Sequence, residues 1–422
     1  MLVRGACAAV RTILHSDLNN FYASVEILKH PELKNMPVAV CGNREERHGI
    51  VLAKNMLAKA AGVQTGDVYW QAKKKCPDLV ELPADFSSYL RVSKEVRKIY
   101  ERYSDCVEAF GIDECWIDVT DSEKIFGGGA AIAEQIRRSI KREIGITVSV
   151  GVSWNKIFAK LGSDLKKPDA VTVITPENYK TVVWPLPVEE MLYVGKATKR
   201  KLNLRGIRTI GDLAAAEEQL LAEWLGKWGS YLHIFANGLD NTPVCKKEEE
   251  RNIKSIGNSL TNYRDLTDEE EVHMLLLLLS DSVAARLRES NFGKAKTVAS
   301  SVTDSMLMKY GKQGKLPLPS RSAADIADAA FNLFREIYPW VNPVRALGVS
   351  VRDFSGPIEQ MDFFTDVLSE KKTEELEKAV DTLRKKYGNN IIQRAAILKD
   401  EKLRRMDIKA EHVIHPENFF GK

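Results

Sequence analysis

Apolar and polar positions alternate with two different periods in the first half of the chain, which predicts a mixture of strands and helices. A short apolar strand ends at Asp17, and a helix that Asn19 or Asn20 is suited to cap follows it. The order strand, helix, two strands, helix, strand is the split βαβ arrangement, which predicts a ferredoxin-like sheet. The predicted strands cover 12–17, 37–41, 50–53, two segments within 107–120, and 146–152, and the predicted helices cover 21–29, 54–61, 86–103, 130–143 and 155–168.

The pattern changes twice beyond residue 175. Two glycine-containing turns beside short helices, within residues 188–213, match a helix–hairpin–helix motif. A charged linker without leucine, isoleucine or valine follows at 245–251, and a second α+β module and a separate tail come after it. In that module we expect strands at 254–263, 295–310 and 345–353, helices at 268–290 and 322–338, and in the tail an amphipathic helix of about 371–387.

Composition limits the class of protein. The chain has 422 residues, of which 44% are apolar, so we expect two to four domains with substantial cores. No apolar run approaches the roughly 20 residues of a membrane span, and the first 14 residues lack the hydrophobic core of a signal peptide. The six cysteines are scattered without a CxxC pair, which is typical of reduced thiols. We therefore expect a cytoplasmic protein that does not contact a membrane; we also expect a monomer.

Two adjacent carboxylates, Asp113 and Glu114, stand at the glycine-containing turn between the two predicted strands of 107–120. Two neighbouring anions repel each other, and a divalent cation with oxygen ligands would relieve that repulsion. The competing interpretation is a solvated surface turn. A split βαβ sheet can bring the end of its first strand beside this turn, which would add Asp17 as a third carboxylate. Asp17 and Asp113 would then hold two Mg²⁺ ions together with Glu114 and the carbonyl of Leu18, an arrangement suited to phosphoryl or nucleotidyl transfer.

Basic residues gather at three places, and the net charge of +4 permits nucleic-acid binding. Lys166 and Lys167 stand at the exit of the helix at 155–168, where they suit a phosphate or simply a solvated helix end. Between residues 286 and 321 eight Lys or Arg stand against two Asp or Glu, which suggests a basic face for backbone phosphates. In the helix–hairpin–helix motif, the amides at Gly195 with Lys196, Lys199 and Arg200 would hold a phosphate without reading sequence.

Three separated motifs, at 16–26 (SDLNNFYASVE), 110–120 (FGIDECWIDVT) and 150–161 (VGVSWNKIFAKL), resemble those of the Y-family translesion DNA polymerases of the bacterial polymerase IV-like and UmuC-like kind. The resemblance runs from about residue 12 to about 354. It implies a right-hand α+β polymerase with a ferredoxin-like palm, fingers, a helical thumb and a separate α+β little finger. The implied boundaries are 1–27 with 88–180 for the palm, 28–87 for the fingers, 181–243 for the helix–hairpin–helix thumb, 244–253 for a linker, 254–354 for the little finger and 355–422 for the C-terminal tail.

The resemblance also implies roles for single residues. Asp17, Asp113 and Glu114 look like the metal-binding and catalytic carboxylates, and Tyr22 looks like the steric gate against a ribose 2′-hydroxyl. Lys167, Lys59 and Asn55 fall where the family contacts the incoming nucleotide. The sequence departs from polymerase IV-like relatives at Met56, where tyrosine is usual, and at Lys59, where arginine is usual. Gly111 stands where serine is often found. Triphosphate binding is therefore expected to be weaker or differently arranged, with Lys54 as a possible substitute.

The implied activity is template-directed DNA synthesis past damaged bases, with low fidelity and no proofreading, in DNA repair and damage tolerance. The implied partners are primer–template DNA, a dNTP and a sliding clamp, which the clamp-like motif Gln360, Met361, Phe363 and Phe364 would bind. Packing of the two phenylalanines onto the protein itself is the competing interpretation of that motif. Two other functions stay open from the sequence. A nucleotide cyclase can use paired acids on a similar palm, and a catalytically idle DNA-binding subunit would keep the basic modules.

Overall fold

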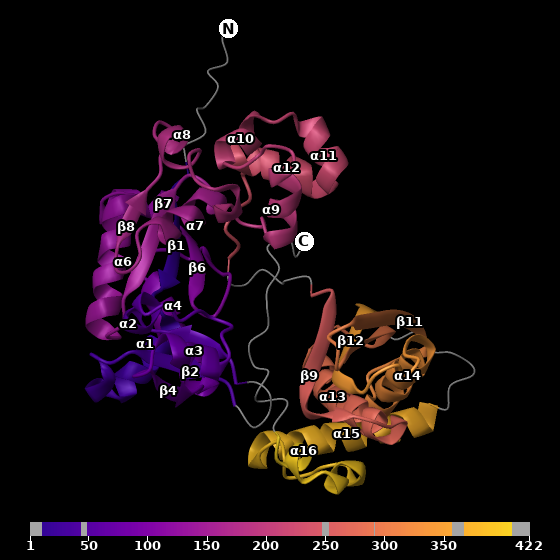
Figure 1. The fold of residues 1–422 in the computed structure, drawn as a ribbon. Helices are drawn as coiled ribbons and strands as arrows, with labels where there is room; N and C mark the ends of the chain where they lie inside the picture. The colour runs from indigo at the N-terminus through magenta and orange to yellow at the C-terminus, as the bar shows by residue number, and fades with distance from the viewer. Residues whose placement is uncertain (1–10, 44–48, 247–252, 291, 357–366, 407–422) are drawn as a thin grey trace. The chain divides into compact units, whose positions relative to one another are not determined.

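The computed structural model describes residues 11–43, 49–246, 253–290, 292–356 and 367–406, with side chains from residue 372 onward in the last range. The chain divides into two compact units (Figure 1). The described part of the first unit is mainly 11–41 with 51–246, and that of the second unit is mainly 253–406. None of the described helices is long and apolar enough to cross a membrane.

The first unit is built on a five-stranded sheet of order β5-β6-β1-β7-β8. The central strand β1 pairs antiparallel with both β6 and β7, β5 pairs antiparallel with β6, and β8 runs parallel to β7 (Figure 1). The order β5-β6-β1-β7 is the ferredoxin-like arrangement that the sequence predicts. The strands are β1 Ile13–Leu18, β5 Val107–Ala109, β6 Glu114–Asp118, β7 Val148–Ser153 and β8 Val171–Val173.

Helices cover both faces of this sheet. Alternate residues of a strand point to opposite faces, so Leu14 and Ile117 belong to the core beneath α1, α4 and α6. His15 and Trp116 point the other way, toward α7, where they are fully buried. The helices are α1 Phe21–Lys29, α4 Phe86–Tyr100, α5 Glu123–Phe126, α6 Gly129–Glu143 and α7 Lys156–Leu165, with 3₁₀ turns η1 Pro31–Leu33 and η2 Thr120–Ser122.

A three-stranded sheet of order β3-β2-β4 belongs to the same unit. The prediction of one helix over 54–61 is wrong at its start, because Asn55 caps the helix by accepting a hydrogen bond from the amide of Ala58. Lys54 therefore ends a strand and does not share a helix face with Lys59. One strand and one helix here, β4 and α3, were not predicted from the sequence. The elements are β2 Val38–Cys41, β3 Val51–Lys54, α2 Met56–Ala60, α3 Tyr69–Lys75 and β4 Val80–Pro83.

The end of the first unit is helical, as the pattern predicts. Thr209 and Asp212 form a reciprocal capping box at the start of α10, which explains the sequence Thr-Ile-Gly-Asp after the second glycine turn. The helices here are α8 Tyr179–Val182, α9 Lys196–Asn203, α10 Ile210–Ala215, α11 Glu218–Leu225 and α12 Lys227–Ala236, with the 3₁₀ turn η3 Val188–Glu190.

The second unit is a four-stranded sheet of order β11-β10-β12-β9 with helices on one face. The predicted strand region at 295–310 holds one strand and the start of a second, which pairs with it antiparallel and runs on to residue 320. The second of them contains Pro317 and Pro319 and few apolar residues, a pattern that suits only an edge strand, whose outer amides need no partner. The elements are β9 Ser255–Leu266, α13 Glu269–Glu289, β10 Ala295–Asp304, β11 Lys309–Ser320, α14 Ala323–Ile337 and β12 Val344–Phe354.

The C-terminal segment is part of the second unit, which corrects the expectation of a separate tail. It consists of α15 Val367–Tyr387, the 3₁₀ turn η4 Ala395–Lys399 and α16 Glu401–Arg405. Ile397, Leu403 and Met406 are buried in the same core as the sheet and α13. The guanidinium of Arg288, which is 6% exposed, lies 2.7 Å from both Glu377 and Asp381 of α15. Such charge pairing depends on which helix faces meet, so it could not be read from the sequence.

Replacement of the buried Leu403 by alanine tests this packing in the full-length protein. We expect the free energy of unfolding of the second unit to fall by about 2–4 kcal/mol, because the buried isopropyl group of leucine is lost and a cavity remains. Leu398→Ala is the matched control, since Leu398 is 57% exposed in the same segment. Urea unfolding followed by circular dichroism is the measurement. Equal, negligible effects of the two substitutions would show that the segment does not contribute to the core.

Candidate active site

Asp17 and Glu114 lie directly opposite each other on the neighbouring strands β1 and β6. Residues opposite each other in an antiparallel pair project to the same face of the sheet, so the two carboxylates meet there. Asp113 precedes β6 immediately, and its carbonyl accepts a hydrogen bond of 3.0 Å from the amide of Leu18. The structure thus brings together Asp17, Leu18, Asp113 and Glu114, which the sequence analysis grouped from the order of the elements alone.

Helix α4 holds the turn that carries Asp113. The Ser93 hydroxyl donates to the carbonyl of Ile112, and the Arg97 guanidinium donates to the carbonyl of Gly111 at 3.0 Å. A Cβ added at Gly111 would lie 3.4 Å from Asp113 Oδ1, so glycine leaves the carboxylate more room than serine would. The turn is therefore fixed through its backbone carbonyls.

Helix α7 places two lysines on these carboxylates. Lys160 Nζ lies 2.8 Å from Glu114 Oε1, and Lys167 Nζ, just past the helix end, lies 2.8 Å from Asp17 Oδ2. Lys160 is only 14% exposed. The sequence analysis assigned Lys167 to the nucleotide site but missed Lys160. Spacing alone could not have marked Lys160, because Lys167 lies beyond the end of α7 and the two lysines do not share a helix face.

His15 is a second residue that the sequence analysis missed. It is fully buried between β1 and α7, with Nδ1 2.8 Å from the Ser163 hydroxyl and Nε2 3.9 Å from Glu114 Oε2. Burial, with the charges of Lys160 and Lys167, holds the pKa of His15 well below its usual value. The imidazole is therefore neutral at pH 7, and it packs against Glu114 without competing for a proton.

Burial raises the pKa of Asp17 to about 7, with a further contribution from a hydrogen bond to Glu114 and with Lys167 opposing the shift. Burial and the charge of Asp17 raise the pKa of Asp113 to about 6. Closely placed oxygen ligands that carry this excess of negative charge fit a hard divalent cation such as Mg²⁺. Among the described residues, no three His, Cys, Asp or Glu side chains form a ready-made metal cluster. Instead, lysine ammonium groups contact Asp17 and Glu114.

Tyr22, a residue of α1, lies beside the carboxylates. Its ring stacks on Tyr89 at 4.2 Å between centroids and contacts the edge of Phe86. Burial, and after it the charge of Asp113, raise the pKa of Tyr22 to about 12. A ring held on two sides by aromatic neighbours is a rigid wall, as a steric gate requires. Asn20, one of the two predicted helix caps, makes no side-chain cap hydrogen bond.

The residues predicted to contact the nucleotide differ in availability. The Asn55 side chain caps α2, accepts from the amide of Val38 at 3.1 Å and donates to the carbonyl of Met36 at 2.7 Å, so it serves the fold. Lys59 is exposed, and its charge helps to lower the pKa of Lys54, after the larger effect of burial. The two cations are thus close although they lie on different elements. Met56 is 39% exposed and offers no hydrogen-bond donor.

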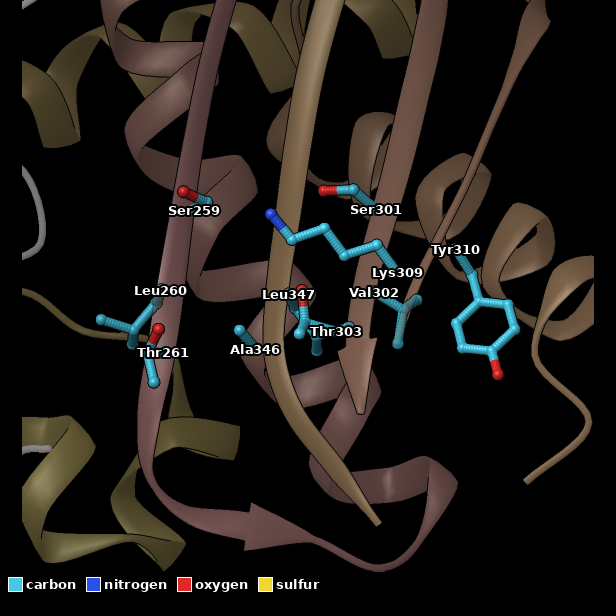
Figure 2. Close-up of a pocket in the computed structure, with 10 residues that line it drawn as sticks. All are labelled: Ser259, Leu260, Thr261, Ser301, Val302, Thr303, Lys309, Tyr310, Ala346 and Leu347. Atoms are coloured by element: carbon cyan, nitrogen blue, oxygen red, sulfur yellow. The ribbon is translucent and has the colours of Figure 1, made fainter. Parts of the chain in front are cut away.

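Two further surfaces suit a nucleic-acid backbone. At the first turn of α9, Gly195, Lys196 and Arg200 are exposed, whereas Lys199 contacts Glu189 at 2.5 Å. In the second unit, the sheet face opposite the helices carries small and hydroxyl side chains around a pocket of about 550 Å³. Figure 2 shows Ser259, Thr261, Ser301 and Thr303 on this face, with the Lys309 side chain extended across it. The motif Gln360, Met361, Phe363 and Phe364 lies outside the described residues.

Comparison with known proteins gives a consistent result. The model of the impB/mucB/samB family matches residues 16–164, and that of its C-terminal domain matches residues 253–363. A DNA polymerase IV of Acetivibrio thermocellus is 52% identical over 398 residues, 94% of this chain and 100% of the relative. DNA polymerase IV 1 of Bacillus subtilis is 37% identical over 93% of this chain and 94% of the relative. A solved Y-family DNA polymerase chimera, 26% identical, covers 82% of this chain and 99% of its own with a TM-score of 0.72.

The raised pKa of Asp113 predicts that this carboxylate costs stability in the metal-free protein. A carboxyl group whose folded pKa is raised favours folding as pH falls through about 6 toward 4 and opposes folding above that range. Asp113→Asn should therefore raise the free energy of unfolding at pH 8 by about 1–2 kcal/mol and flatten its pH dependence. Urea unfolding with a chelator at pH 5 and pH 8 measures this. Asp105→Asn, at an exposed carboxylate, is the control, and destabilisation by Asp113→Asn at pH 8 would contradict the interpretation.

Proposed function

This chain belongs to the impB/mucB/samB family and is a Y-family DNA polymerase, and from that premise we propose that it copies DNA past damaged bases by two-metal nucleotidyl transfer. The observation that carries the proposal is that Asp17, Glu114 and the turn with Asp113 meet where strand β1 ends and strand β6 begins. Asp17 and Glu114 are cross-strand partners, and the Leu18 amide ties Asp113 to them. The Y-family fold has palm, fingers, thumb and little-finger domains, and we propose the boundaries given by the sequence for them.

We assign the binding of two Mg²⁺ ions to Asp17, Asp113, Glu114 and the Leu18 carbonyl. Bound there, the ions would lower the pKa of the primer 3′-hydroxyl and neutralise the leaving pyrophosphate. The protein contributes a fixed turn for Asp113, held by Ser93 and Arg97 of α4. It also contributes the buried Lys160, which keeps Glu114 in place, and the partly exposed Lys167, whose ammonium can exchange Asp17 for a triphosphate oxygen.

Residues around the carboxylate site are suited to recognise the nucleotide. We propose that Tyr22 excludes the ribose 2′-hydroxyl and that Lys167, Lys59 and Lys54 attract the triphosphate. We leave Asn55 out of this set, because its side-chain amide is engaged in capping α2 and in binding β2. Lysines act as point charges without the fork of arginine, so the triphosphate would be held by charge more than by geometry. A loosely held nucleotide accords with low fidelity.

DNA would be gripped by its backbone. We propose that the exposed amides and cations at Gly195, Lys196 and Arg200 hold phosphates of the duplex, and that the open sheet face of the second unit holds others. Small hydroxyl side chains and Lys309 on that face let a phosphate backbone approach closely without reading base sequence. Lys199 enters this contact only by leaving Glu189.

The remaining parts of the proposal come from the sequence. The chain offers no further carboxylate set that we recognise as a proofreading exonuclease, so we propose synthesis without proofreading. Gln360, Met361, Phe363 and Phe364 are proposed to bind a sliding clamp. We propose that the protein acts in the cytoplasm. We also propose that it acts as a monomer, because one chain supplies the carboxylates, the lysines and the gate.

The central test is extension of a primed template with Mg²⁺ and four dNTPs. Asp113→Asn and Glu114→Ala should each reduce extension by about 10³-fold or more. Each removes a metal ligand, and with it several kcal/mol of the stabilisation that the bound ions give to the charged transition state. DNA binding measured by fluorescence anisotropy should change little. Asp105→Asn, at an exposed acid of the same unit, is the matched control. Normal extension by both site variants would refute the assignment, and failure of the wild-type protein to extend would refute the polymerase.

The gate is tested by the ratio of ribonucleotide to deoxyribonucleotide insertion. Tyr22→Ala should raise this ratio roughly 10–100-fold, the effect expected when a clash worth about 1–3 kcal/mol is relieved. Tyr22→Phe keeps the ring that stacks on Tyr89 and should keep the wild-type ratio. Steady-state single-nucleotide insertion gives both numbers. An unchanged ratio in Tyr22→Ala would limit Tyr22 to packing at the start of α1.

A further inference from the structure

Five charged side chains close a ring between the sheet and α7. Glu114 contacts Lys160 at 2.8 Å, Lys160 lies 3.6 Å from Asp164, Asp164 contacts Lys167 at 2.8 Å, and Lys167 contacts Asp17 at 2.8 Å. The ring closes because Asp17 and Glu114 are opposite each other on β1 and β6. Three carboxylates and two ammonium groups alternate around it, except at the Asp17–Glu114 junction, where two like charges meet.

Asp164 is the member of the ring that neither the sheet nor the proposed metal site accounts for. Its two carboxylate oxygens face different lysines, Oδ1 toward Lys167 and Oδ2 toward Lys160. Asp164 stands on α7 one turn after Lys160, and it also reaches Lys167, which follows the end of the helix. Its side chain is 40% exposed, against 14% for Lys160 and 28% for Lys167. Asp164 therefore stands on the solvent side of the ring, away from the like-charged junction.

We propose that Asp164 is a positioning residue that shares the two lysines with the catalytic carboxylates and thereby sets how readily Asp17 and Glu114 accept divalent cations. This inference rests on the proposed function of those carboxylates. Each lysine divides its charge between Asp164 and one site carboxylate. Without Asp164, both ammonium groups would pair with Asp17 and Glu114 alone and compete more strongly with a cation. When a cation displaces Lys160 and Lys167 from the site carboxylates, Asp164 remains as their anionic partner.

The alternative is a solvated helical charge pair, which contributes little at an exposed position. The two interpretations differ in whether the charge of Asp164 affects the site carboxylates. A solvated pair would leave the carboxylates unaffected, whereas the ring predicts that loss of Asp164 is felt at Asp17 and Glu114. Other acids of the same unit allow this comparison. Asp105, for example, pairs with Lys246 at 2.6 Å on the surface, outside the ring.

The experiment is Mn²⁺ binding to the full-length protein without DNA or nucleotide, followed by the electron paramagnetic resonance signal of free Mn²⁺. We expect Asp164→Asn to weaken Mn²⁺ binding roughly tenfold, from the loss of one nearby negative charge and the tighter hold of both lysines. Lys167→Met should strengthen binding, because it removes a competing cation from Asp17. Asp105→Asn is the matched control and should shift the affinity less than twofold.

A double variant tests whether Asp164 acts through the lysines. In Asp164→Asn combined with Lys167→Met, we expect the effect of losing Asp164 to shrink to about half or less of its value in the wild-type background. An undiminished effect there, or a shift by Asp164→Asn no larger than that of Asp105→Asn, would overturn the proposal. Asp164 is partly exposed, so its replacement should leave the fold intact, which circular dichroism checks. No Mn²⁺ binding by the wild-type protein would instead overturn the proposed function.

Discussion

The close approach of α7 to the central sheet is the constraint on which the site depends. A Cβ on Gly151 of β7 would lie 1.9 Å from the backbone oxygen of Ala159, so only glycine allows the helix to rest there. Gly162 faces it from the helix, where a Cβ would lie 3.1 Å from the Cα of Gly151. At that separation the lysines of α7 reach the acids of β5 and β6 directly, and Lys167, just beyond the helix, reaches Asp17 of β1. Contact between two backbones, not a long side chain, sets the distance across which the charges pair.

Helix α7 also anchors the segment that leaves the last helix of the first unit. Lys156 is 1% exposed, and its ammonium group lies 2.7 Å from both oxygens of Glu108, which accepts a further hydrogen bond from the amide of Cys245. A buried ion pair is costly to desolvate and is offset only when its remaining hydrogen bonds are satisfied. Here the carbonyl of Pro243 and the ring of Trp116 complete the surroundings of the ammonium group. One face of α7 thus carries both Lys160, which contacts Glu114, and Lys156, which holds the segment after α12 through Glu108.

Much of the fold could be predicted from the sequence, because the sheet order follows from the order of its elements and their periods. Asp17, Asp113 and Glu114 could be grouped for the same reason, since strand ends and turns stay fixed within that topology. Lys160, His15 and Asp164 could not, because their roles depend on which face of α7 meets the sheet and how closely. Similarly, the docking of α15 depends on acids that meet Arg288 only after two helices pack. In these cases the sequence does not contain the needed quantity, which is the distance between two packed elements.

The composition of β11 has a consequence for the behaviour of the molecule in a crowded solution. Among the described strands, β11 is an edge strand, and an edge strand can offer backbone groups to an extended chain that collides with it. Pro317 and Pro319 remove two amide donors from that edge, and Lys309, Lys312 and Lys315 add positive charge along the same strand. Such residues are known deterrents to strand addition by another chain. The protein can thus expose a hydroxyl-rich sheet face while disfavouring self-assembly through intermolecular β-pairing.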